Sequence, residues 1–174
     1  MITRRFLLSG AAAIAFAASA SIAAAEDQTE KVKAASQAFY AALDARDPSA
    51  MAKVYAHTPY VVHIDPTAKV IALGWEAVNK SWENVHDGTT QINVLFTETG
   101  QPQIVGDLAW EVGHENGPVT TKDGKIVNID AFATNVYQNK MANGAWSLTK
   151  LVKYRNSGRA SLKARALRIE LEPP

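Results

Sequence analysis

The sequence predicts an α+β roll, in which three N-terminal helices pack on the concave face of a curved, mostly antiparallel sheet. Apolar residues recur at helical spacing only as far as about His86, and alternating strand patterns joined by short turns fill the chain from there to Ser157. The hairpin expected at 128–157 carries apolar residues on both faces. Such a sheet needs cover on both sides, from helices on one and from another sheet or a second subunit on the other.

The first 25 residues have the form of a bacterial export signal. Arg4 and Arg5 precede an alanine-rich apolar run that ends at Ala25, before Glu26. Paired arginines favour the twin-arginine route, which carries folded proteins. The alternative is an uncleaved membrane anchor, but a run dominated by alanine makes a poor stable span. We therefore expect a periplasmic or secreted protein, with no membrane contact after the signal is cleaved.

Removal of residues 1–25 leaves 149 residues (174 minus 25), which we divide into one domain at 26–157 and a tail at 158–174. This mature part has 16 basic residues (18 minus 2) and 17 acidic ones. A near-neutral balance without a basic stripe argues against nucleic-acid binding. The chain has no cysteine, so disulfides and thiolate chemistry are excluded. The basic residues of the tail form a solvated face or, alternatively, bind an anion or a partner.

The elements are expected in the order helix, helix, short hairpin, helix and then long strands. Asp47 is expected to cap the second helix, with Pro48 in its first turn. A loop is expected over Gly117 and Pro118. The expected helices are 28–45, 47–55 and 74–86, and the expected strands are 60–64, 69–73, 91–99, 103–115 and the two arms of 128–157.

Several motifs in this order resemble the nuclear transport factor 2-like superfamily, which includes ketosteroid isomerases and SnoaL-like polyketide cyclases. They are the segments FYAALDARD at 39–47, YAH at 55–57, GWEAV at 74–78, ATNVY at 133–137 and GAWSL at 144–148. The resemblance spans roughly 28–157 and implies a cone-shaped roll that forms homodimers through its outer sheet face. It also implies a pocket for a small hydrophobic or carbonyl-containing ligand, and a cofactor-free isomerase, cyclase or dehydratase that transfers protons next to a carbonyl.

The resemblance gives two carboxyl groups a possible catalytic role. Asp65 stands before a proline, directly after the first expected strand. Its position is similar to that of the general base of ketosteroid isomerase, a standard example of proton transfer next to a carbonyl. Its alternative role is ordinary turn chemistry. Asp130 resembles the oxyanion-hole acid of those enzymes and should face the same way as Phe132. Alternatively, it is ionised and paired with Lys150 or Lys153 across the hairpin.

Two further residues complete the candidate catalytic set. The family's oxyanion tyrosine falls at or near Phe39, and Tyr40 can supply that hydroxyl only if the register shifts by one residue. His63 is either a general acid or base, or a half-buried histidine with satisfied hydrogen bonds.

The remaining candidates are aromatic or imidazole side chains that could line a ligand pocket or pack in the core. The four histidines lack metal-ligand spacing and no phosphate-binding loop is present, so we expect neither a metal nor another cofactor. The sequence leaves three functions open, namely an enzyme, a binding module and a dimeric interaction scaffold. The candidate ligand-binding residues are Tyr55, Tyr60, Trp75, Trp82, Trp110, His114 and Phe132.

Overall fold

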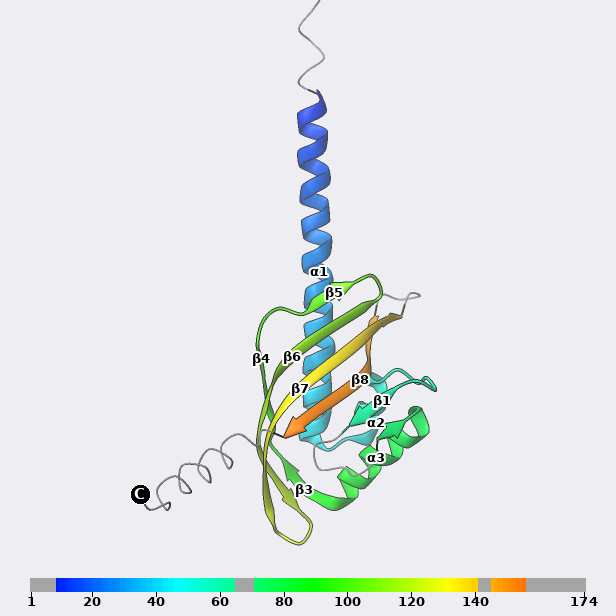
Figure 1. Ribbon diagram of the computed structural model, residues 1–174, viewed down its shortest axis with the longest axis vertical. Coiled ribbons are helices and arrows are strands. Elements are labelled where there is room, and N and C mark those ends of the chain that lie inside the picture. Colours follow the sequence, from blue (N-terminus) through cyan, green and yellow to red (C-terminus); the bar gives the residue numbers. More distant parts are fainter. Residues whose placement is uncertain (1–8, 65–70, 141–144, 156–174) are drawn as a thin grey trace, which may run out of the picture.

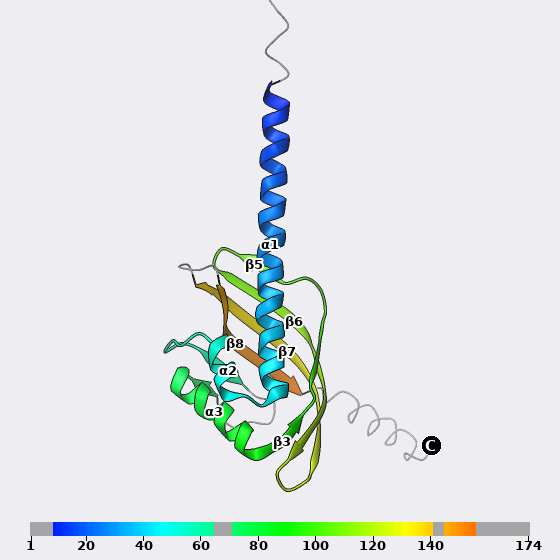
Figure 2. The same cartoon turned by 180° about the vertical axis from the view of Figure 1, so that it is seen from behind.

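The structure is a computed structural model that describes residues 9–64, 71–140 and 145–155, with the side chains of 9–25, 140 and 150–155 left out. Within this part of the chain, three helices lie on the concave side of one curved sheet (Figures 1 and 2). The predicted α+β roll is therefore confirmed. The helices are α1 Ser9–Ala45, α2 Pro48–Val54 and α3 Trp75–Gly88. The strands are β1 Val62–Ile64, β2 Ala72–Leu73, β3 Thr89–Ile92, β4 Leu95–Glu98, β5 Gln103–Val105, β6 Leu108–Thr121, β7 Ile126–Lys140 and β8 Ala145–Arg155.

The three long strands form the body of the sheet. The strand order is β2-β1-β8-β7-β6-β3, and β4 and β5 also pair with β6. Strand β1 runs parallel to β8, whereas the other pairings are antiparallel. Because side chains alternate along a strand, the central strand β7 has one face against the helices and one away from them. The odd-numbered residues from Ala131 to Tyr137 are buried, whereas Phe132 on the other face is half exposed.

The core lies between α1, α3 and the sheet. It is aromatic and aliphatic, and edge-on ring contacts join Phe39 of α1 to Tyr55 and Trp82. The first half of α1 extends away from the sheet (Figure 1). Among the described residues, no helix combines the length and apolar character that crossing a membrane requires. The buried apolar side chains include Val32, Phe39, Leu43, Met51, Tyr55, Val61, Val78, Trp82, Ile92, Ala109, Tyr137, Trp146 and Leu148.

Helix α1 ends in a tight turn that starts α2 directly. The Arg46 backbone N–H bonds to the Leu43 carbonyl and that of Asp47 bonds to the Ala42 carbonyl, the two bonds of a Schellman motif. Arg46 occupies its left-handed position, with φ of 53°. The Asp47 carboxylate then accepts from the backbone of residues 49 and 50, so the predicted cap of α2 is confirmed.

The Arg46 side chain joins this turn to the end of α3 and the start of β3. Its guanidinium donates to the His86 carbonyl at 2.8 Å, to Thr89 Oγ1 at 3.1 Å and to the Thr90 carbonyl at 3.1 Å. One side chain therefore satisfies backbone groups at a helix end and fixes the angle between α1 and α3.

Three expectations about the strands were wrong. The single strand expected at 103–115 is divided into β5 and β6, which pair as an antiparallel hairpin. The single strand expected at 91–99 is divided into β3 and β4, because the Val94 N–H donates to Asp44 of α1 and the Asn93 N–H donates to the Pro118 carbonyl. The expected loop at Gly117 and Pro118 instead lies inside β6. At Gly117 φ is 143° and a side chain would overlap the Asn93 carbonyl, so glycine permits the close approach that bends this strand.

Replacement of Arg46 tests its role as a clamp. Arg46→Ala should lower the free energy of unfolding in urea by roughly 1–3 kcal/mol, because three hydrogen bonds of a charged donor are lost, one of them partly buried. Arg46→Gly should lower it less, since glycine adopts the left-handed conformation without strain. The control is Lys80→Ala, which removes one exposed ion pair of α3 and should change stability by less than about 0.5 kcal/mol. Equal stabilities for Arg46→Ala and Lys80→Ala would contradict this role.

Candidate functional site

A cluster of hydrogen-bonded polar side chains lies inside the apolar core, between α1 and the strands β6 and β7. We call it the polar cluster. Its helical members lie one turn apart on α1, and its strand members lie on the buried face of the sheet. The polar cluster consists of Ser36 and Tyr40 of α1, Glu111 and Glu115 of β6, and Asn135 and Tyr137 of β7.

Glu111 is the centre of this network. Its Oε1 atom accepts hydrogen bonds from Ser36 Oγ at 2.6 Å, from Tyr137 Oη at 2.6 Å and from Asn135 Nδ2 at 2.8 Å. The side chain is 2% exposed. Burial of a carboxyl group is costly unless hydrogen bonds replace those of water, and three donors on one oxygen provide that replacement.

Glu115 lies two positions further along the same face of β6 and is also buried. Its Oε1 atom accepts a hydrogen bond from the Tyr40 hydroxyl at 2.7 Å, and that hydroxyl accepts one from Asn135 Nδ2 at 3.1 Å. Asn135 therefore links the two carboxyl groups through Tyr40. The network is continuous from Glu111 to Glu115.

Both tyrosines of the polar cluster act as hydrogen-bond donors. Burial, reinforced by the nearby Glu115 carboxylate, raises the pKa of the Tyr40 hydroxyl far above its ordinary value. Burial and the Glu111 carboxylate likewise raise the pKa of Tyr137. Each phenol is therefore neutral at physiological pH and can donate to a carboxylate or to a ligand oxygen.

Phe96 of β4 covers the polar cluster. Its ring is stacked on Tyr40, with ring centroids 4.9 Å apart and planes 10° apart. Gly113 lies between the two glutamates on the buried face of β6, and a side chain there would overlap the Phe96 ring. The absence of a side chain at Gly113 therefore gives the ring its place over the carboxyl groups.

The two aspartates predicted as catalytic lie elsewhere or are not described. Asp65 lies outside the described residues. Asp130 is on the face of β7 opposite the helices, its side chain is 42% exposed, and it accepts a hydrogen bond from His114 Nε2 at 2.7 Å. Strand alternation puts Asp130 and buried Asn135 on opposite faces, so the structure does not bring Asp130 to Tyr40 or to an apolar site.

Tyr40 and His63 are both on the helix side of the sheet but do not meet. Tyr40 belongs to the polar cluster. His63 of β1 is 2% exposed, with Nδ1 3.1 Å from the Tyr55 hydroxyl and its ring edge-on to Trp82 at 4.6 Å. His63, Tyr55 and Trp82 thus pack in the core, and Trp82 also lines a small pocket between α1, α2 and α3.

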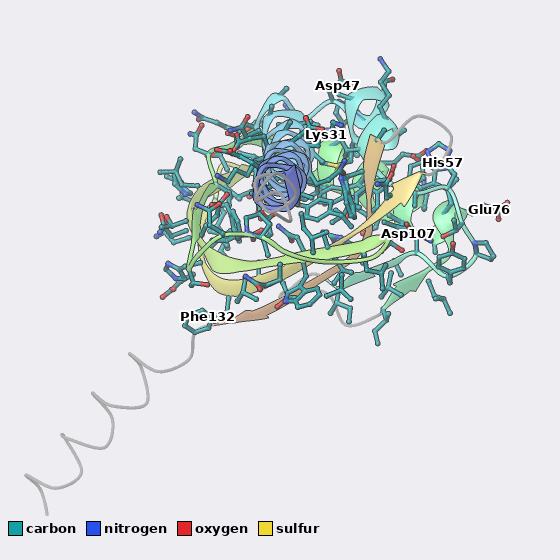
Figure 3. The ribbon with its side chains drawn as sticks, turned by 90° about the horizontal axis from the view of Figure 1, so that it is seen from above. Lys31, Asp47, His57, Glu76, Asp107 and Phe132 are labelled. Carbon is teal, nitrogen blue, oxygen red and sulfur yellow. The ribbon has the colours of Figure 1, made fainter. Side chains whose placement is uncertain are left out.

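A separate groove lies outside the core, beside the start of α3. Its volume is about 530 Å³, and the His57 and Trp75 rings stack beside it at 3.9 Å. Figure 3 shows His57 and Glu76 at this edge of the molecule. Tyr60 is exposed and donates to Gln138 at 3.2 Å, with no contact to the polar cluster. The groove is lined by His57, Thr58, Pro59, Leu73, Gly74, Trp75, Glu76 and Ala77.

The remaining predicted ligand-binding residues lie on the outer face of the sheet. Trp110 and Phe132 are 36% and 50% exposed there, and the His114 ring lies 5.6 Å from that of Phe132. Figure 3 shows Phe132 on the side of the sheet away from α1. The shared strand face predicted for Trp110 and His114 is present, but it points away from the polar cluster.

Sequence reasoning missed both buried glutamates. Along β6, Glu111, Gly113 and Glu115 alternate with Trp110 and other large residues, so the ordinary expectation turns the larger apolar side chains inward. One signal could have indicated their burial: the two glutamates flank a glycine at alternating positions of a strand whose other residues include hydrophobic ones. No group of three or more His, Asp or Glu side chains suited to a metal ion occurs in the described part of the chain.

Solved structures with the same fold come from several bacteria. A ketosteroid isomerase-like protein of Erwinia carotovora atroseptica is 18% identical, with a TM-score of 0.66, covering 75% of this chain and 97% of that one. A candidate dehydratase of the NTF2-like family from Streptomyces avermitilis is 20% identical, with a TM-score of 0.65, covering 76% and 99%. A candidate calcium/calmodulin-dependent protein kinase type II association domain of Thiobacillus denitrificans is 24% identical, with a TM-score of 0.59, covering 71% and 93%. These likenesses establish the fold.

No curated protein matches the chain in sequence. The model of the SnoaL-like domain matches residues 32–153, which include α1 from Val32 onward and the whole polar cluster. The protein belongs to the SnoaL-like domain family, with the nuclear transport factor 2-like fold.

Proposed function

We propose that the domain binds a small, largely apolar carbonyl compound against the polar cluster and moves a proton on it without a cofactor. The observation that carries this proposal is the burial of two carboxyl groups, Glu111 at 2% and Glu115 at 0% exposed, in an otherwise apolar core. Packing alone does not call for such groups, since apolar side chains of the same size would fill the space at lower cost. Buried acids on the concave side of this fold therefore favour a functional role.

Tyr40 and Glu115 have complementary roles in this proposal. The Glu115 carboxylate accepts a proton from carbon next to the carbonyl, and the Tyr40 hydroxyl donates a hydrogen bond to the carbonyl oxygen, where charge develops. Return of the proton from Glu115 to another carbon completes an isomerisation. Its return to a hydroxyl group that leaves the β-carbon releases water and completes a dehydration. The names of two similar structures, ketosteroid isomerase-like protein and candidate dehydratase, describe reactions of these types in those proteins.

A second proposal is self-association through the outer sheet face. We infer it from an exposed apolar patch on strands β6 and β7, which water would otherwise contact. We call this the outer patch, and it consists of Leu108, Trp110, Val112 and Phe132, which are 36–50% exposed. In a homodimer with this interface, the second copy of the chain buries the outer patch.

We also propose that residues 1–25 direct export to the periplasm or the medium and are removed. Two described contacts that attach α1 to the domain support this, because both involve residues after the expected cleavage point. The Trp146 indole donates to Gln28 at 3.1 Å, and Val32 is fully buried. Cleavage before Glu26 therefore leaves the packed half of the helix intact.

Proton transfer can be measured with benzylacetone, a small ketone with a phenyl group, as the exchange of its carbonyl-adjacent hydrogens for deuterium in D₂O. The protein should accelerate this exchange, and Glu115→Gln or Tyr40→Phe should slow it by about a hundredfold, the usual effect of losing an acid or base. Glu98→Gln, the same change at an exposed carboxyl of β4, should leave the rate unchanged. Exchange no faster than in buffer, or a fully active Glu115→Gln variant, would contradict the proposal.

The dimer can be tested by sedimentation of the mature protein. We expect a species of twice the chain mass that Phe132→Lys converts to monomer, because a buried charge opposes the apolar contact. Ile71→Lys alters a side chain of similar exposure beside the distant strand β2 and should keep the dimer. A monomeric wild-type protein at high concentration would rule out this interface.

Export can be tested by expression of the full chain in a bacterium and mass determination of the product in each fraction. The periplasmic or secreted product should begin at Glu26, and replacement of Arg4 and Arg5 by lysine should reduce it if the twin-arginine route is used. A product of full length that remains in the cytoplasm would refute export.

A further inference from the structure

Two buried oxygen atoms of the polar cluster lack hydrogen-bond donors. They are Glu111 Oε2 and Asn135 Oδ1, and none of the described residues donates to either. The two side chains are 2% and 0% exposed, so these oxygens also have no contact with bulk water. An acceptor buried without a donor costs free energy, so two of them on neighbouring side chains are a feature that needs a cause.

The two acceptors belong to one small region. Glu111 and Asn135 lie directly opposite each other in the β6–β7 register, and the Asn135 amide donates to Glu111 Oε1 at 2.8 Å. All three donors to Glu111, from Ser36, Tyr137 and Asn135, reach Oε1, and no described residue donates to Oε2. The network thus supplies donors on one side of the carboxyl group and leaves acceptors on the other.

Charge supports the same conclusion. Glu111 makes no ion pair with any described residue, and its three partners are neutral hydroxyl and amide groups. A ligand group that carries N–H or O–H bonds would satisfy Oε2 and, if cationic, would also compensate the carboxylate.

We propose that Glu111 Oε2 and Asn135 Oδ1 form an acceptor subsite for a hydroxyl or ammonium group of the ligand. This rests on the proposed function and narrows its substrate class to carbonyl compounds that also carry an alcohol or amine. In this arrangement the ligand's carbonyl lies at Tyr40 and its hydroxyl or ammonium group lies at the acceptor subsite. The hydrogen bond from Asn135 to Tyr40 connects these two positions.

Access to the acceptor subsite depends on Phe96. Its ring covers the space above Gly113, between the two glutamates, and is stacked on Tyr40. Strand β4, which carries Phe96, has four residues and pairs with β6. Movement of this one ring opens the polar cluster without loss of the β6–β7 pairing, and the displaced ring then supplies an aromatic wall for the apolar part of the ligand.

The test compares three probes that share one carbon skeleton, namely benzylacetone, its β-hydroxy derivative and its β-amino derivative. Dissociation constants come from NMR titration, with the side-chain amide of Asn135, the Glu111 carboxyl carbon and the Tyr40 ring as reporters. The hydroxy and amino probes should bind about tenfold more tightly than benzylacetone, the effect of one well-placed hydrogen bond. They should also shift the Glu111 carboxyl signal, which benzylacetone should leave unchanged.

Glu111→Gln gives the sharpest variant, because it keeps the size of the side chain but replaces one acceptor oxygen with a donor. It should remove the preference for the hydroxy and amino probes. The dissociation constant of benzylacetone should change by no more than about twofold. Glu98→Gln, the exposed control on β4, should keep the preference. The ranking of probes on wild-type protein needs no variant, so a Glu111→Gln protein that does not fold leaves the test intact.

Each outcome separates the two proposals. If benzylacetone shifts the Tyr40 signals but the added hydroxyl or amine brings no gain, the acceptor subsite is refuted while the proposed function stands. An unchanged ranking in Glu111→Gln refutes the subsite in the same way. If no probe shifts Tyr40, Glu111 or Asn135, both proposals fail for this class of ligand, and ordered water is left as the partner of the two oxygens.

Discussion

The rest of the structure depends on the hydrogen bonds that hold the carboxyl groups of Glu111 and Glu115 inside the core. Ser36 and Tyr40 bring donors from α1, and Asn135 brings donors from β7, so helix and sheet must keep one relative position for the carboxyl groups to remain satisfied. An apolar core would tolerate small shifts of α1 along the sheet. A buried acid does not, because each lost donor leaves an oxygen without water or a partner.

Each face of the sheet departs in part from the usual distribution of polar and apolar groups. The inner face holds two acids beneath a helix, whereas the outer face exposes Trp110, Val112 and Phe132 beside the His114 and Asp130 pair. A monomer built only for stability would show the opposite arrangement. Both departures have an explanation if the inner face receives a ligand and the outer face receives a second copy of the chain.

Periodicity predicted the fold because it reports which face of an element is buried. It placed α2, α3 and the β7–β8 hairpin, with Asp47 as a helix cap. It favoured the wrong face of β6, since the large apolar residues lie on one face and the glutamates on the other, and burial of the glutamates depends on tertiary donors from α1. The same limit explains Tyr40. Its place on α1 was suggested by resemblance, but its partner Glu115 lies 75 residues away, and only the folded chain brings them together.

The most direct measurement is a crystal structure of the mature protein soaked with the β-hydroxy derivative of benzylacetone. Our account predicts density for the compound on the concave side of the sheet, with its carbonyl oxygen at the Tyr40 hydroxyl, its own hydroxyl at Glu111 and Asn135, and the Phe96 ring displaced. Density in the groove beside His57 and Trp75, with Phe96 still stacked on Tyr40 and only water at Glu111, would contradict it.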